Sequence, residues 1–159
     1  MTHVHLIGIG GTGISSIARV LFEMGYAVSG SDRSLSPLAL DLKQAGVTIF
    51  EGHAAENIKG ADIVVRSSAI SDENVEVVAA RAQGIPVQKR SDFLNSLLRD
   101  YTVLAVAGSH GKTTTSTMLA LTLDRLGMQP GFILGVVSRD LGTNARAGGG
   151  KYFVIEADE

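Results

Sequence analysis

The chain has 159 residues, of which 45% are hydrophobic, 19 are glycine and none is cysteine or tryptophan. This length allows one α/β domain, or one and a half, with a buried core. A formal net charge of −2 without a basic stripe argues against a nucleic-acid partner, and the lack of cysteine excludes disulfides, thiolate catalysis and cysteine-based zinc sites. No apolar run approaches the ~20 residues of a membrane span, so we expect a cytoplasmic protein with no membrane partner.

The first motif is a glycine-rich loop between a strand and a helix. Residues 4–9 predict a buried strand, and the sequence GIGGTG at its end satisfies the GxGxxG pattern of dinucleotide-binding folds. A helix with Ile14, Ile17, Ala18 and Leu21 on one face is expected to follow and to end before Gly25. The residues predicted to hold a nucleotide or diphosphate are Gly10, Gly11, Thr12 and Gly13.

An acidic residue supports this interpretation. The next predicted strand, 27–30, leads to Asp32, close to where dinucleotide folds place an acid that meets a ribose diol. Two alternatives stay open: the glycines could serve only close packing of helix on sheet, and Asp32 could belong to an ordinary polar turn.

Three more strands and three more helices complete the first unit. Ser36 and Pro37 are typical of a helix start, as N-cap and first helical residue. Between residues 74 and 83 we expect Val75, Val78, Ala79 and Ala82 to face inward. The predicted helices are 38–45, 74–83 and 91–98, and the predicted strands are 47–50, 61–65 and 85–88.

Polar side chains follow several of these strands. His53, Ser67 and Ser68 come just after predicted strands, and ligands of open α/β sheets bind at the carboxyl ends of the strands. They are therefore candidate ligand contacts, although each one alone is also typical of a loop or capping residue. Five strands joined by crossover helices predict an α/β fold with a Rossmann-like, doubly wound parallel sheet over residues 1–99.

The second motif, TVLAVAGSHGKTTT, begins at Thr102 and predicts the start of a P-loop-type α/β domain over residues 100–159. Residues 103–107 indicate a buried strand, followed by a loop whose backbone N–H groups can face an anion. A strict GxxxxGK[ST] pattern would need glycine where Val106 stands, so a shorter loop remains. We predict that Lys112 meets the phosphates of ATP and that the Thr113 hydroxyl meets Mg²⁺, whereas His110 more simply shapes the turn. The predicted ATP-binding residues are Gly108, Ser109, His110, Gly111, Lys112, Thr113 and Thr114.

The remaining segments supply a candidate metal site. A helix over 113–126 is expected to be covered on much of its circumference, a strand is expected over 132–137, and 142–146 is expected to be a polar loop. The last segment, 152–159, reads as a buried strand that ends in Glu156, Asp158 and Glu159. Acids beside a phosphate loop are suited to hold Mg²⁺, although a solvated acidic terminus is the alternative.

The second unit has fewer strands than a P-loop sheet needs. Residues 102–159 predict three strands, and we therefore expect this chain to be the amino-terminal piece of a longer enzyme.

The motifs together resemble a known family. GIGGTGISSIA, VSGSD, SSAI, GSHGKTTT, GTNAR and EADE, in this order and spacing, resemble the Mur ligases of peptidoglycan synthesis, most closely those that join L-alanine to UDP-N-acetylmuramate. The resemblance covers essentially the whole chain. It implies a three-domain enzyme with an amino-terminal UDP-substrate domain, a central ATP-binding domain that is truncated here, and a carboxyl-terminal domain that is absent.

The resemblance also implies roles for particular residues. The loop from Gly8 to Gly13 would hold the UDP diphosphate and not NAD, Lys112 would bind ATP phosphates, and Thr113 and Glu156 would bind Mg²⁺. Asn144 and Arg146 would lie near the sugar nucleotide. ATP would phosphorylate the muramoyl carboxylate, and the amine of L-alanine would attack the acyl phosphate. Alternatives are a recycling ligase that adds a tripeptide and a nicotinamide-dependent oxidoreductase domain.

Overall fold

The computed structural model describes residues 1–157 and divides the chain into two compact units, residues 1–94 and 95–159. The division falls inside helix α4 (Arg90–Leu97), whereas the sequence analysis placed it after residue 99. Among the residues that the structure describes, no helix is long and apolar enough to cross a membrane. The two units are described separately below.

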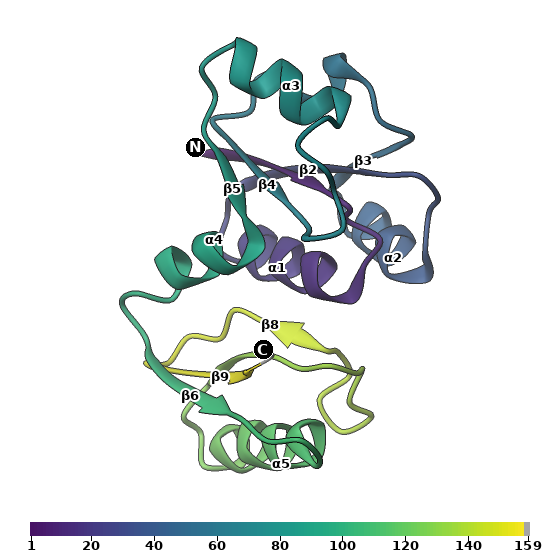
Figure 1. Ribbon diagram of the computed structural model, residues 1–159. Coiled ribbons are helices and arrows are strands. Elements are labelled where there is room, and N and C mark those ends of the chain that lie inside the picture. Colours follow the sequence, from purple (N-terminus) through teal and green to yellow (C-terminus); the bar gives the residue numbers. More distant parts are fainter. Residues whose placement is uncertain (158–159) are drawn as a thin grey trace. The chain divides into compact units, whose positions relative to one another are not determined.

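The first unit is built on a five-stranded sheet in which every neighbouring pair is parallel. Its strand order, β3-β2-β1-β4-β5, confirms the predicted Rossmann-like topology. Helices α1 and α2 lie on one face and α3 on the other, as Figure 1 shows. The strands are β1 (His3–Ile7), β2 (Ala27–Asp32), β3 (Thr48–Glu51), β4 (Ile63–Arg66) and β5 (Val87–Lys89); the helices are α1 (Thr12–Glu23), α2 (Pro37–Ala45), the 3₁₀ turn η1 (Ala55–Ile58), α3 (Val75–Ala82) and α4.

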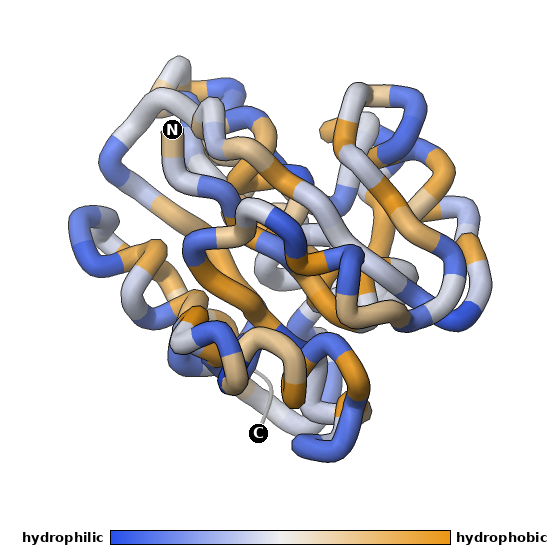
Figure 2. Tube along the Cα trace, turned by 90° about the horizontal axis from the view of Figure 1, so that it is seen from above, coloured by the Kyte–Doolittle hydropathy of each residue, from blue (hydrophilic) through white to orange (hydrophobic). Residues whose placement is uncertain are grey.

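Helices α1 and α2 form as their sequences predict. The Ser36 hydroxyl accepts a hydrogen bond from the Ala39 N–H and caps α2, with Pro37 as its first residue. The predicted apolar face of α1 is buried, since Ile14, Ile17, Ala18 and Leu21 are at most 2% exposed. Hydrophobic and hydrophilic stretches alternate along the helices in Figure 2, as expected for helices that cover a sheet on one side.

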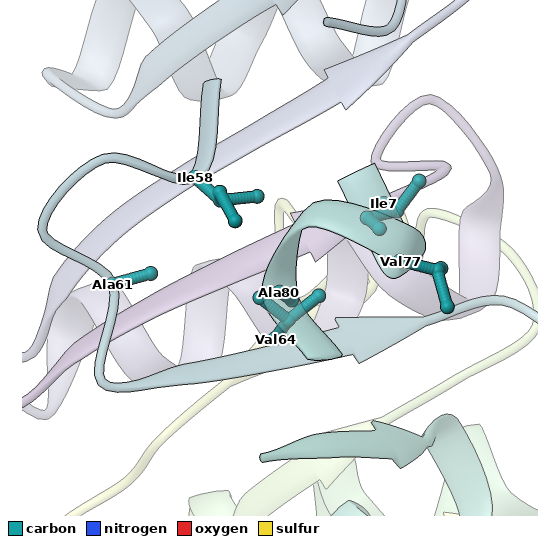
Figure 3. Packing of buried hydrophobic residues seen from close by; sticks show 6 residues of the cluster. All are labelled: Ile7, Ile58, Ala61, Val64, Val77 and Ala80. Atoms are coloured by element: carbon teal, nitrogen blue, oxygen red, sulfur yellow. The ribbon is translucent and has the colours of Figure 1, made fainter. Parts of the chain in front are cut away.

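The buried face of α3 differs from the prediction. Val75 and Val78 were expected inside but are 45% and 52% exposed, whereas Val77 and Ala80 are fully buried. Val77 and Ala80 pack in a cluster with Ile7, Ile58, Ala61 and Val64 (Figure 3). The prediction was wrong because it excluded the polar Glu76 from the core.

Glu76 is a fully buried carboxylate in the first turn of α3. Its Oε1 accepts hydrogen bonds from the Asn57 side chain at 2.6 Å and the Ala54 N–H at 3.3 Å, and its Oε2 accepts from Ser31 at 2.5 Å and His5 at 3.4 Å. Burial alone would raise the pKa of Glu76, but the hydrogen bonds from His5, Ser31 and Asn57 outweigh it and lower the pKa from 4.5 to about 2. The burial of this charge therefore determines which face of α3 meets the sheet.

The second unit contains a four-stranded sheet of order β6-β9-β7-β8. Three strands are parallel, and the short β8 pairs antiparallel with β7 inside the segment expected to be a polar loop. Helix α5 packs on the sheet through a core of Ala120, Phe132, Leu134 and Val154. The elements are β6 (Thr102–Val106), α5 (Lys112–Arg125), β7 (Gly131–Ile133), β8 (Ala145–Arg146) and β9 (Tyr152–Glu156).

Two expectations for the second unit were wrong. Strand β6 was expected to be buried, but it is an edge strand in the described chain and Val103 is 37% exposed. Helix α5 was expected to be covered on much of its circumference, but it buries only Ser116 and Ala120, and Met118 is 64% exposed. Among the described residues, β6 pairs only with β9, and α5 packs on the sheet through one side.

The packing of α3 predicts unequal effects of two neighbouring valines. Val77→Ala should lower the free energy of unfolding of the first unit by about 2 kcal/mol, because it leaves a cavity in the core. The same truncation at the exposed Val78 should change it by less than about 0.5 kcal/mol. Urea unfolding followed by circular dichroism measures both, and equal effects would contradict the observed face of α3.

The lowered pKa of Glu76 predicts a pH-dependent stability. A carboxyl group with a pKa of about 2 when folded and about 4.5 when unfolded stabilises the fold above pH 4.5, and this contribution is lost as the pH falls toward 2. Its slope is at most about 1.4 kcal/mol per pH unit. In Glu76→Gln this component should be missing from unfolding curves recorded between pH 5 and pH 3. The exposed Glu73→Gln is the matched control and should keep the wild-type slope.

Candidate functional site

The glycine-rich loop of the first unit is held by the end of strand β2. The parallel register of β1 and β2 puts Ile7 beside Ser31, and the Ser31 carbonyl accepts hydrogen bonds from the N–H groups of Gly8 at 2.8 Å and Ile9 at 3.1 Å. Asp32 Oδ2 accepts from the Gly10 N–H at 2.8 Å. The structure thus brings Asp32 and the glycine loop together and gives Asp32 a role in holding the loop that was not predicted.

A second side chain holds the carbonyl of the same glycine. The Ser36 hydroxyl donates to the Gly10 carbonyl at 2.9 Å while it caps α2. A side chain at Gly10 would place its Cβ 2.9 Å from Asp32 Oδ2 and 3.3 Å from Ser36 Oγ. Position 10 therefore requires glycine, because a side chain there would come too close to Asp32 and Ser36, which hold the loop.

The start of α1 combines free backbone donors with a cation. No side chain of residues 1–157 caps this helix, and the Ile14 N–H already donates to the Gly11 carbonyl, so the amides of Thr12 and Gly13 are the ones available to an anion. The guanidinium of Arg90 lies against Gly13, where an added Cβ would come within 2.9 Å of its Cζ and Nη1. Arg90 makes no salt bridge among residues 1–157. Arg90 was not predicted as a site residue, because it lies far from the glycine-rich motif along the chain.

The two serines after β4 have different surroundings. Ser67 lies next to the loop, since a Cβ on Gly8 would come within 3.1 Å of the Ser67 Cβ, whereas Ser68 is exposed. The buried Arg66 holds this turn through the Ile70 carbonyl and Asp72. A hydrogen bond from Arg81 and the charge of Arg66 lower the pKa of Asp72, although desolvation partly opposes them. Ser67 therefore belongs to the same edge as the glycine loop.

His53 reaches this edge through Ser31 and Glu76. Its Nδ1 is 3.1 Å from Ser31 Oγ and 3.5 Å from Glu76 Oε2, and its side chain is 13% exposed. Glu76 was not predicted as a site residue. A glutamate at an otherwise apolar helical position was the signal that could have revealed it.

The loop of the second unit, Gly108 to Gly111, is closed by a hydrogen bond from Lys112. Gly111 has a φ of 77°, which glycine adopts without strain, and it precedes the first residue of α5. The Lys112 ammonium donates to the Gly108 carbonyl at 2.9 Å and so closes the loop. Ser109, His110 and Thr114 are exposed on this loop and on the first turn of the helix.

Glu156 joins β9 to the start of α5. The register of β6 and β9 pairs Val106 with Glu156, which places the carboxylate beside the strand that leads into the loop. Glu156 Oε2 accepts a hydrogen bond from Thr113 Oγ1 at 3.0 Å, and Oε1 accepts from Ser116 Oγ at 3.1 Å and the Gly135 N–H at 2.7 Å. The predicted neighbours Thr113 and Glu156 are thus in direct contact, and Ser116 and Gly135 are additional partners that were not predicted.

The oxygen atoms at Glu156 fit a hard divalent cation. A hydroxyl and a carboxylate are ligands that Mg²⁺ prefers, and Mg²⁺ usually keeps several waters beside one or two protein ligands. A Cβ on Gly135 would lie 3.1 Å from Glu156 Oε2 and 3.3 Å from Thr113 Oγ1, so glycine keeps this space open. No group of three or more histidine, aspartate or glutamate side chains suited to a metal occurs in residues 1–157. The predicted acids Asp158 and Glu159 lie outside the described residues.

Asn144 and Arg146 lie in the second unit around β8. Asn144 is 5% exposed, and its carbonyl accepts from the Leu134 N–H. Arg146 pairs with Asp124 at 2.5 Å and lies over the Phe132 ring. In this unit both residues thus hold β8 against α5 and β7.

The sequence of the chain matches a known family and several curated proteins. The model of the Mur ligase family, catalytic domain, matches residues 3–102. The UDP-N-acetylmuramate–L-alanine ligase of Bradyrhizobium sp. (strain ORS 278) is 50% identical over 98% of this chain and 33% of its own length. The enzyme of the same name from Pelotomaculum thermopropionicum is 47% identical over 99% of this chain and 34% of its own length. The chain therefore spans about a third of the length of these relatives.

Solved structures show the same fold. UDP-N-acetylmuramate–alanine ligase from Thermotoga maritima superposes with a TM-score of 0.91 at 31% identity, over 98% of this chain and 37% of that one. A UDP-N-acetylmuramate:L-alanyl-γ-D-glutamyl-meso-diaminopimelate ligase from Neisseria meningitides gives 0.91 at 36% identity, over 100% of this chain and 53% of that one. The family match, these identities and the shared fold lead to one conclusion: the chain belongs to the Mur ligase family.

Proposed function

We propose that this chain is part of an ATP-dependent ligase that joins L-alanine to UDP-N-acetylmuramate through an acyl phosphate. The observation that carries the proposal is the contact of Glu156 with Thr113 beside the loop that contains Lys112. The same chain also has a glycine-rich loop, held by Asp32, of the kind that binds a diphosphate. The relatives of that name match nearly the whole chain, which supports the choice of substrate. The proposal covers the whole enzyme, of which this chain would supply the first part.

The first unit would bind the UDP end of the substrate. Exposed amides at the start of α1 can donate to a diphosphate, and the guanidinium of Arg90 beside Gly13 adds a positive charge there. Asp32 accepts a hydrogen bond from the Gly10 N–H and so holds the loop that would receive the diphosphate. The names of the relatives at 47–50% identity favour a nucleoside diphosphate sugar over a nicotinamide cofactor.

The second unit would bind ATP and position it for transfer of its terminal phosphoryl group. Lys112 is placed to exchange the Gly108 carbonyl for phosphate oxygens, and the exposed amides of Ser109 to Gly111 can donate to the same group. Thr113 and Glu156 would hold Mg²⁺, whose charge would neutralise the phosphates. Such a reaction needs positioning and charge neutralisation and no nucleophile from this chain.

A second candidate is the recycling ligase that takes a tripeptide in place of L-alanine. The solved structure of the Neisseria enzyme, whose name includes that peptide, fits this chain as well as the alanine enzyme from Thermotoga does. The curated relatives at 47–50% identity favour L-alanine. Use of ATP and of nucleotide-linked precursors would place either enzyme in the cytoplasm.

Ligand-induced thermal stabilisation separates the proposal from an oxidoreductase. UDP-N-acetylmuramate at 100 times its Kd should stabilise the chain by about 2.7 kcal/mol, and NADH at the same concentration should have no effect. Differential scanning fluorimetry measures both. Stabilisation by NADH alone would refute the proposed ligand of the glycine loop.

Replacement of Lys112 should separate the two nucleotide sites. In a full-length ligase that contains this segment, Lys112→Ala should abolish ligation, because the phosphates of ATP lose their cation, and should leave the Kd of UDP-N-acetylmuramate unchanged. Product assays and calorimetry measure the two properties. The exposed Lys59→Ala, in the other unit, is the control and should alter neither. An equal loss of both properties in Lys112→Ala would contradict separate sites.

A further inference from the structure

The buried Glu76 carboxylate imposes a direction on the hydrogen bonds around it. An ionised carboxylate can only accept hydrogen bonds, and the hydrogen bonds to Glu76 keep it ionised at neutral pH. Ser31 has a single hydroxyl proton, and its Oγ lies 2.5 Å from Glu76 Oε2. That proton is therefore donated to Glu76, and Ser31 Oγ is left as an acceptor.

The direction of the Ser31 hydrogen bond determines which ring nitrogen of His53 carries a proton. Ser31 Oγ lies 3.1 Å from His53 Nδ1, and Glu76 Oε2 lies 3.5 Å from the same nitrogen. Both neighbours accept, so Nδ1 must carry a proton. In the neutral imidazole Nε2 then has a lone pair and accepts hydrogen bonds.

The His53 ring lies at the edge where the ligand is proposed to bind. Its side chain is partly exposed, whereas Glu76 is fully buried. Ser31, which holds His53 through its hydroxyl, also holds the first residues of the glycine loop through its carbonyl. Ser31 therefore links the His53 ring, whose orientation Glu76 controls, to the loop on which the ligand is proposed to bind.

We propose that Glu76 is a positioning residue which, through Ser31, fixes His53 in the tautomer with the proton on Nδ1, so that Nε2 accepts a hydrogen bond from an N–H or O–H group of the bound nucleoside diphosphate. The ligand part rests on the proposed function of the glycine loop. The tautomer part rests only on contacts within the first unit.

Glu76→Gln should reverse the direction of the hydrogen bonds that run from residue 76 through Ser31 to His53. The amide nitrogen of the variant would face two donors, Asn57 and the Ala54 N–H, on the Oε1 side. On the Oε2 side it would meet Ser31, whose hydroxyl can turn, and His5 Nε2, whose ring can take the other tautomer. The amide would then donate to Ser31, Ser31 would donate to His53 Nδ1, and the ring proton would move to Nε2. Glu73→Gln removes the same charge at an exposed position and is the matched control.

The tautomer is measured by long-range ¹H–¹⁵N spectra of the imidazoles in the 159-residue chain at pH 8. The expected result is a protonated Nδ1 of His53 in the wild type and in Glu73→Gln, and a protonated Nε2 in Glu76→Gln. A wild-type His53 protonated on Nε2 would overturn the proposal without reference to any variant, so the test holds even if Glu76→Gln does not fold.

The ligand part is tested by calorimetric titration with UDP. Glu76→Gln and His53→Ala should each raise the Kd about fivefold to tenfold, which corresponds to the loss of one hydrogen bond. The double variant should bind UDP no more weakly than His53→Ala, because Glu76 acts through His53. Additive losses would show that Glu76 has only a general structural role and would overturn the proposal. If the wild type binds no UDP, the proposed function fails together with the ligand part, and the tautomer spectra still decide the rest.

Discussion

The burial of one negative charge organises the first unit. Glu76 lies in the interior between α3 and the sheet, where an unpaired carboxylate would be very costly, and it is tolerated because β1, β2 and the loop before η1 each supply a donor. Helix α3 cannot turn to bury Val75 and Val78 without removing the carboxylate from these donors. The charge therefore selects the face of the helix, and the surrounding valines and alanines fill the space that remains.

The two units hold their loops in a similar way. In each, an acid at the end of a strand that is parallel and adjacent to the loop-bearing strand forms the main contact: Asp32 beside the loop after β1, and Glu156 beside the loop after β6. Parallel strands make this possible because their carboxyl ends meet at one edge of the sheet. The partners differ, since Asp32 binds a backbone N–H of its loop, whereas Glu156 binds hydroxyls on the helix that follows.

Local patterns were sufficient to predict much of the fold. Short apolar runs, glycine stops and the Ser36-Pro37 start identified the five strands and the caps of the first unit, because these features depend on neighbours in sequence. The pairing of Thr113 with Glu156 was instead implied by the family resemblance, since the two residues lie far apart in the sequence. Local patterns could not predict Arg90 beside Gly13 or Ser31 beside Glu76, because such contacts depend on which strands become neighbours and on how far a helix is rotated. Strand β6 shows the converse, since its apolar sequence indicates burial, whereas among the described residues it is an edge strand with Val103 37% exposed.

The surroundings of the two glutamates explain why only one is suited to a metal. Glu76 is fully enclosed, and both of its oxygens accept from groups that hold the fold together, so no cation could approach without breaking the unit apart. Glu156 is half-buried, and its Oε1 is tied to Ser116 and to the Gly135 backbone. Its Oε2 accepts only from the Thr113 hydroxyl within the described residues, and a hydroxyl can turn its proton away and offer a lone pair. In the proposed magnesium site, Thr113 and Oε2 would therefore hold the cation while Oε1 keeps the carboxylate in place.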